Sequence, residues 1–164
     1  MRSLPGAGSD AGSDADTGAA DPLVAAALAS YECDGAGSPV LAALTRSRLL
    51  VPVVAVPGTD AETGAADTSA DIAAVLMRGQ DSRMALLAFT SLASMHSWDP
   101  SARPVPVSTA DAARAAVQEG ADAVVVDVGG PVMFVVESGE MEELAAGHVL
   151  ARTSAGYAWL TGQP

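Results

Sequence analysis

The stretch Ala123-Val124-Val125-Val126-Asp127-Val128 decides the fold, because it is the strongest strand signal in the 164 residues. It is continuous and rich in β-branched residues, so we expect a strand that is buried on both faces. Gly129-Gly130-Pro131 then predicts a turn into a second strand over 132–136. Upstream, Ser108-Thr109-Ala110-Asp111 has the shape of a helix N-terminal capping box, and the helix ends at Gly120.

The same reading extends to both ends of the chain. Asp21-Pro22 and Ser38-Pro39 are helix start signals, and Pro52 within an apolar run favours an edge strand or a bulge. Residues 72–77 and 84–89 flank a polar turn and predict a β-hairpin. Pro104-Val105-Pro106-Val107 is expected to be extended but outside a central ladder. We expect helices over about 22–32, 39–46, 92–98 and 139–146, and strands over 49–56, 72–77, 84–89 and 104–107.

These elements fit one domain over residues 21–152. Residues 1–20 hold little to bury and predict a disordered acidic tail, and residues 57–69 predict a mobile acidic loop. Residues 153–164 are expected to form a loose C-terminal tail, although its aromatic residues could dock back. The fold class is α/β (α+β): a mixed β-sheet with hairpins, packed by short helices.

Composition excludes several functions. The net charge of −12 and the isoelectric point near 4.2 argue against binding to nucleic acid or to an anionic membrane. All eight basic residues are arginine, so no lysine is present for a phosphate loop or a Schiff base. The Ala, Gly, Val and Asp content is typical of high-GC bacterial proteins.

The thiol and imidazole inventory is small. Cys33 is the only cysteine, so no internal disulfide can form, and two histidines add no zinc-type cluster. Acidic neighbours on both sides favour an incidental role for Cys33. His96 and His148 have no motif that links them to a nucleophile. We expect no cofactor or metal, no secretory signal, no membrane span and a cytoplasmic location.

Two places could still form a functional site. Asp127, followed by glycines at the end of the strongest strand, resembles a ligand site beyond a strand's carboxyl end. The simpler interpretation is a turn in which Gly129-Gly130 supply positive φ and Asp127 accepts nearby amides. Trp98 is expected to anchor the core with the two phenylalanines; alternatively it is exposed at a ligand or partner surface, near Thr90, Ser91 and Arg103.

The middle of the chain resembles a known family. The ordered segments are Leu86-Leu87-Ala88-Phe89-Thr90-Ser91, Trp98, Arg103-Pro104-Val105-Pro106-Val107, Gly120-Ala121-Asp122-Ala123-Val124-Val125-Val126-Asp127 and Gly130-Pro131. Over roughly residues 21–150 they resemble the N-terminal domain of the SseB family, the enhanced serine sensitivity proteins, in its actinobacterial form. The resemblance implies a compact α/β domain without an established catalytic mechanism. The family often has Asn or Asp, then Pro, then Gly after this strand; here Val128 and Gly129 follow Asp127, so no role is transferred to the turn.

Three functional hypotheses follow. The first is a non-enzymatic cytosolic interaction or regulatory module that binds an unknown protein partner. The second is a small-metabolite binding domain, for an amino acid or a carboxylate, or a weak enzyme, in which an arginine would hold the carboxylate. The third is an assembly subunit that pairs through a sheet edge near Pro52. The candidate ligand or partner surface consists of Thr90, Ser91, Trp98, Arg103 and Asp127.

Overall fold

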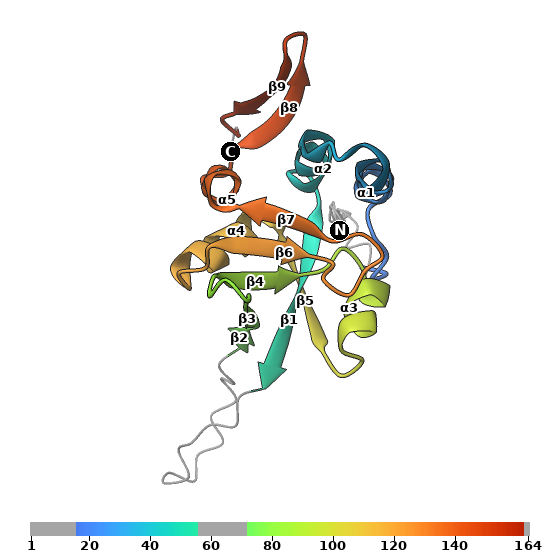
Figure 1. Cartoon of the computed structure of the whole chain (residues 1–164), viewed down its shortest axis with the longest axis vertical. Helices are drawn as coiled ribbons and strands as arrows, with labels where there is room; N and C mark the ends of the chain where they lie inside the picture. Colours follow the sequence, from blue (N-terminus) through green and yellow to red (C-terminus); the bar gives the residue numbers. More distant parts are fainter. Residues whose placement is uncertain (1–15, 56–71, 163–164) are drawn as a thin grey trace, which may run out of the picture.

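The computed structural model of the protein describes residues 16–55 and 72–162 (Figure 1). The predicted loop at 57–69, residues 1–15 of the predicted tail and residues 163–164 lie outside the described residues. In chain order the elements are α1 (Pro22–Asp34), α2 (Gly37–Leu44), β1 (Arg48–Ala55), β2 (Ile72–Ala74), β3 (Leu76–Arg78), β4 (Met84–Ala88), α3 (Leu92–Trp98), β5 (Arg103–Ser108), α4 (Thr109–Gln118), β6 (Ala123–Val126), β7 (Phe134–Glu137), α5 (Ser138–Ala145), β8 (Val149–Thr153) and β9 (Gly156–Leu160).

Helix boundaries follow the capping residues. The Asp21 side chain accepts hydrogen bonds from the first amides of α1, and α1 ends where Gly35 adopts a left-handed φ of 67°. Ser91 caps α3, and Ser108 caps α4 by accepting from the Asp111 amide at 3.0 Å. These polar side chains satisfy amides that have no partner inside the helix, so they set where α1, α3 and α4 begin. The predicted cap at Ser38 is wrong, because α2 already begins at Gly37 and has no side-chain cap. The predicted helix starts are nevertheless confirmed to within a few residues.

The strands form three sheets, one of which is mixed, as the sequence predicts. The two larger parts have the orders β2-β1-β5 and β3-β4-β6-β7, and β8 pairs with β9 alone. Leu50 and Phe89 join the two parts by exchanging backbone hydrogen bonds of 2.8 Å in both directions. Strands β4 and β6 are parallel, whereas the other paired strands are antiparallel. The two predicted hairpins, β3–β4 and β6–β7, are both present.

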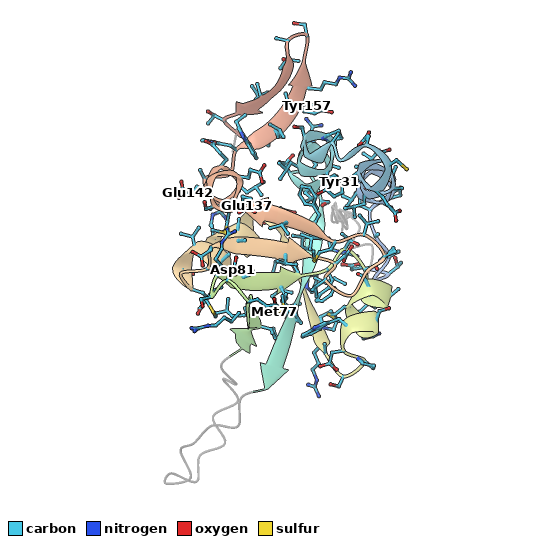
Figure 2. The ribbon with its side chains drawn as sticks, viewed as in Figure 1. Tyr31, Met77, Asp81, Glu137, Glu142 and Tyr157 are labelled. Atoms are coloured by element: carbon cyan, nitrogen blue, oxygen red, sulfur yellow. The ribbon has the colours of Figure 1, made fainter. Side chains whose placement is uncertain are left out.

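Two apolar cores lie on opposite faces of β4 and β6. Side chains alternate along β6, so Val124 and Val126 join the core under α1, α2, α4 and α5, while Val125 joins a smaller core with Met95 of α3. All four β6 residues are buried, which confirms the predicted two-sided burial. Tyr31 of α1, labelled in Figure 2, packs edge-on against Phe134 of β7 with ring centroids 5.2 Å apart.

The edge position predicted for Pro52 is wrong, because β1 lies between β2 and β5. Leu50 turns its backbone polar groups toward Phe89, so Pro52, two residues further on, faces the same side. If the β1–β2 register continued by one residue, Val75 would stand opposite Pro52 and its carbonyl would need an amide donor there. The Val75 carbonyl instead accepts from the Leu87 amide. The proline therefore sits where the neighbouring strand leaves β1 for β4, and no ladder hydrogen bond is lost.

The true edge beside β1 is β5, which carries two prolines. Pro104 and Pro106 stand opposite Pro52 and Leu50 in the antiparallel register. Because Leu50 directs its polar groups away from β5, these are non-hydrogen-bonded pairs, and the nitrogens of Pro104 and Pro106 face outward. The outer edge of β5 lacks amide donors at both positions, which blunts it against pairing with another chain. A contact between chains at this edge would therefore involve β5 and not Pro52 itself.

Both predicted tails are ordered in their described parts. In the segment 16–20, the Gly18 carbonyl accepts from the Leu92 amide at 2.7 Å, which satisfies a free donor at the start of α3. Near the C-terminus, β9 pairs with β8 along its whole length, where a loose tail was expected. This hairpin projects beyond α2 and α5 (Figure 1), and Trp159 packs against the larger core. Alternating aromatic and small residues over 156–160 suit such a strand.

None of the described helices combines the length and the apolar character needed to cross a bilayer.

Candidate functional site

A cleft opens beyond the carboxyl ends of β4 and β6, the parallel pair. Its walls are α1, the start of α3 and the loop that joins β6 to β7, and its volume is about 580 Å³. Parallel strands of open sheets commonly present ligand sites at this end. Most of the lining residues are small, and six of the fifteen are polar: Ala20, Ala25, Leu28, Ala29, Glu32, Thr90, Ser91, Ala93, Ser94, Ser97, Asp127, Gly129, Gly130, Pro131 and Val132.

Asp127 is the central polar group of the cleft wall. Its side chain is 2% exposed and accepts three hydrogen bonds. The donors are the Thr90 amide at 2.8 Å, the Thr90 hydroxyl at 2.6 Å and the Ser94 hydroxyl at 2.7 Å. A buried carboxylate needs such donors because it has lost its hydration. The network therefore ties the end of β6 to the start of α3.

Asp127 has an exposed counterpart at the other end of the same strand pair. The Asp122 carboxylate accepts from the Met84 amide at 2.8 Å, and the Asp122 amide donates to the Met84 carbonyl at 2.7 Å. Asp127 repeats this pattern where the strands end, with its amide donating to the Ala88 carbonyl at 3.0 Å. Aspartates thus clasp both ends of the β4–β6 pair, and only the one at the cleft is buried.

Arg48 supports the cleft from behind. Its guanidinium donates to the Thr90 carbonyl at 2.7 Å and to the Ala19 carbonyl at 2.7 Å, and it pairs with the Asp16 carboxylate. The hydrogen bonds from Arg48 hold the pKa of Asp16 below its usual value. This contact explains why residues 16–20 lie against the domain.

The turn after β6 differs from its prediction. Asp127 itself adopts a left-handed φ of 55°, which aspartate tolerates, and Gly130 has a φ of 92°, whereas Gly129 is not in that region. Gly129 is needed for a different reason: a Cβ there would lie 3.0 Å from the Cβ and the backbone nitrogen of Trp98. The Asp127 carboxylate accepts a hydrogen bond from the backbone amide of Thr90, which follows β4, and not from an amide of the turn.

The structure brings Thr90, Ser91 and Asp127 together at the cleft, but not the other two candidates. Trp98 is half-buried, packs on Phe89 with ring centroids 5.5 Å apart, and belongs to the smaller core. Arg103 is exposed on β5 and does not line the cleft.

Sequence reasoning missed Ser94 and Arg48. Ser94 was detectable, because a serine three residues after the Ser91 cap can complete a capping box, and both of those contacts are present. Arg48 gave no local signal, since its partners lie 29 to 42 positions away in the chain.

The remaining candidates stay apart from the cleft. Cys33 is exposed and free, and His148, which follows α5, contacts Glu143 of that helix. Across residues 16–55 and 72–162, no three His, Cys, Asp or Glu residues gather as metal ligands would.

Fold and cleft together define a small mixed α/β domain with one parallel strand pair, whose carboxyl end is closed by a buried aspartate. The model of the SseB protein N-terminal domain matches residues 24–143, and the chain belongs to this family. The match runs from α1 into α5 and includes all of the cleft lining except Ala20. No curated protein and no solved structure matches the chain.

Proposed function

We propose that this chain is a non-enzymatic interaction or regulatory module that binds a protein partner in the cytosol. The observation that carries the proposal is the state of the polar groups around the cleft. A general acid or base must exchange a proton with substrate. Asp127 is instead buried, and its oxygens are occupied by Thr90 and Ser94. An exposed free thiol at Cys33 suits a reducing compartment.

The cleft walls suit an inserted side chain of a partner. Alanines at 20, 25, 29 and 93 line it together with Gly129. Because these side chains are small and apolar, they leave room in the cleft for a side chain from outside. A pocket of this kind accepts an apolar or aromatic anchor from another protein, the usual centre of binding energy at an interface. Selectivity then comes from shape, with Glu32 and Ser97 as polar groups in the lining.

The test fills the cleft without touching the core. Ala29 is exposed on α1 and lines the cleft, whereas Ala26 is equally exposed on the same helix but does not line it. Tagged wild-type, Ala29→Trp and Ala26→Trp chains are recovered from their own cells, and bound proteins are quantified. We expect a stoichiometric partner with the wild type and Ala26→Trp, and its loss with Ala29→Trp. A partner that binds all three equally would contradict the cleft as its site.

A small-metabolite binding domain is the second candidate, because the cleft lies where parallel strands present ligands. A carboxylate ligand lacks its expected arginine, since Arg103 does not line the cleft. Glu32 instead favours an amine or the amino group of an amino acid. We expect a bound ligand at a hundred times its dissociation constant to stabilise the chain by about 2.7 kcal/mol. Amino acids and amines that leave the melting temperature unchanged at millimolar concentration would contradict this candidate.

The narrower assignment to the actinobacterial form of the family stays a prediction.

A further inference from the structure

A second depression lies on the opposite face of α1 from the cleft. It is a groove of about 480 Å³ between α1, α2 and β8, and we call it the arginine groove. Leu23 and Ala27 contribute one wall from α1. The cleft uses Ala25 and Ala29 of the same helix, which point the other way because an α-helix turns 100° per residue. The two depressions are therefore separate sites.

The floor of the arginine groove is apolar. Ala42 and Ala43 of α2 follow Pro39 by three and four residues, the spacing of a common helix face, and Leu150 of β8 lines the groove with them. Ala42, Ala43 and Leu150 all pack in or against the larger core. At the rim, Leu23 is 73% exposed and is the most exposed large apolar side chain among the described residues. An apolar side chain from outside would cover it.

Two arginines stand at the polar side of this groove. Arg46 follows the C-terminal end of α2 and Arg152 lies on β8, and both are exposed. Within the described residues neither makes a salt bridge or a side-chain hydrogen bond, whereas Arg48, Arg83 and Arg114 all pair with acids.

Among the described residues, the one acid in the groove lining forms no ion pair with either arginine. Asp21 is the acidic residue in the lining, and its carboxylate already accepts two amides at the start of α1. Arg46 and Arg152 together outweigh the single charge of Asp21, so this groove is a local basic site in a chain of net charge −12.

We propose that the arginine groove binds a segment of a partner protein that presents an acidic side chain or a terminal carboxylate beside an apolar one. The guanidinium groups of Arg46 and Arg152 donate to the carboxylate, for which a planar fork of donors is well matched. The apolar side chain covers Leu23 and the alanine floor. The net acidity of the rest of the chain repels acidic segments elsewhere, so charge selects this groove as well as the partner. This inference goes beyond the cleft proposal and does not depend on it.

The experiment selects peptides and then breaks the match. A displayed library of random short peptides is panned on the purified full chain, and the affinity of a labelled selected peptide is measured by fluorescence polarisation. We expect enriched peptides to carry Asp, Glu or a free C-terminal carboxylate beside Leu, Ile or Phe. The Arg46→Glu and Arg152→Glu variants should each weaken binding about tenfold or more. Arg103→Glu, at an exposed arginine outside the groove, should leave it unchanged.

Rescue separates recognition from damage to the fold. A peptide with Lys in place of its acid should bind the Arg46→Glu/Arg152→Glu chain better than the wild type, and Ala29→Trp should not affect either peptide. Peptides without acidic enrichment, or equal weakening by Arg103→Glu, would overturn the proposal. Size-exclusion chromatography of the pure chain provides the other refutation: a dimer that the double reversal dissociates would assign the groove to a second copy of the chain.

Discussion

Replacement of Asp127 by alanine is the sharpest test of the structural account of the cleft. The substitution removes the acceptor for three hydrogen bonds at 2.6 to 2.8 Å and leaves the Thr90 amide and hydroxyl without their partner. Ser94 loses less, because its hydroxyl also contacts the Ser91 carbonyl at 3.0 Å. Alanine must in addition adopt a φ of 55°.

The expected magnitude follows from these contacts. A hydrogen bond to a charged group contributes about 1.5–3 kcal/mol, and a left-handed conformation costs alanine about 1 kcal/mol. Since such terms are not additive, we expect Asp127→Ala to lower the free energy of unfolding by about 3–5 kcal/mol. Asp127→Asn should cost about 1–2 kcal/mol, because asparagine tolerates the same φ and its amide can donate to the Thr90 hydroxyl.

Chemical denaturation, followed by circular dichroism, measures these differences, and Asp122→Ala is the matched control. Asp122 clasps the other end of the same strand pair but is exposed, so water can replace its bond to Met84. We expect its loss to cost about 1 kcal/mol or less. If Asp127→Ala were no more destabilising than Asp122→Ala, the buried network would not hold the cleft wall and the reasoning would be refuted.

Three further predictions concern other features. Gly129→Ala should destabilise the chain by about 1–3 kcal/mol because its Cβ would meet Trp98 at the end of α3. Gly139→Ala, with open space around it in α5, should stabilise the chain by about 0.5–1 kcal/mol. Equal melting temperatures of the two variants would contradict this pair of predictions. Pro106→Val restores an outward amide on the β5 edge and should increase self-association with concentration in sizing experiments; an unchanged monomer would show that the edge is protected otherwise. The hydrogen bond from Arg48 lowers the folded-state pKa of Asp16, so the stability from this pair is fully present above the unfolded pKa near 3.8 and is lost as pH falls through the lower folded value. Asp16→Asn should therefore reduce the change of melting temperature with pH across that window. An unaltered dependence of melting temperature on pH would refute the coupling.

Local signals were sufficient for most elements of the fold. Caps at Asp21, Ser91 and Ser108 define the helix starts because their side chains bond amides only two or three residues away. Likewise, the β-branched run at 123–126 identifies the central strand because burial on both faces leaves no polar alternation. Such features depend on neighbours in the chain, so the sequence alone contains them.

Features that depend on distant partners could not be predicted. Pro52 was expected at an edge because proline has no amide to donate. In the structure Val75 bonds Leu87 instead, so no donor from Pro52 is needed. Residues 16–20 were expected to be disordered because they hold little to bury. Their order depends on the contact of Asp16 with Arg48, which lies 32 positions along the chain and gives no local signal. In both cases composition gave the right local preference, and a tertiary contact determined the outcome.

The buried aspartate also limits what the cleft can recognise. The Thr90 amide leaves the ladder where the chain bends into α3, and the Ser94 hydroxyl stands at the third position of that helix; one carboxylate serves both. The polar groups of Thr90, Ser94 and Asp127 are therefore engaged in making the bend. We expect recognition at the cleft to depend on the shape of its small-residue walls, and recognition of charge to depend on the arginine groove. A variant that closes the cleft and a variant that reverses the groove should then abolish different interactions.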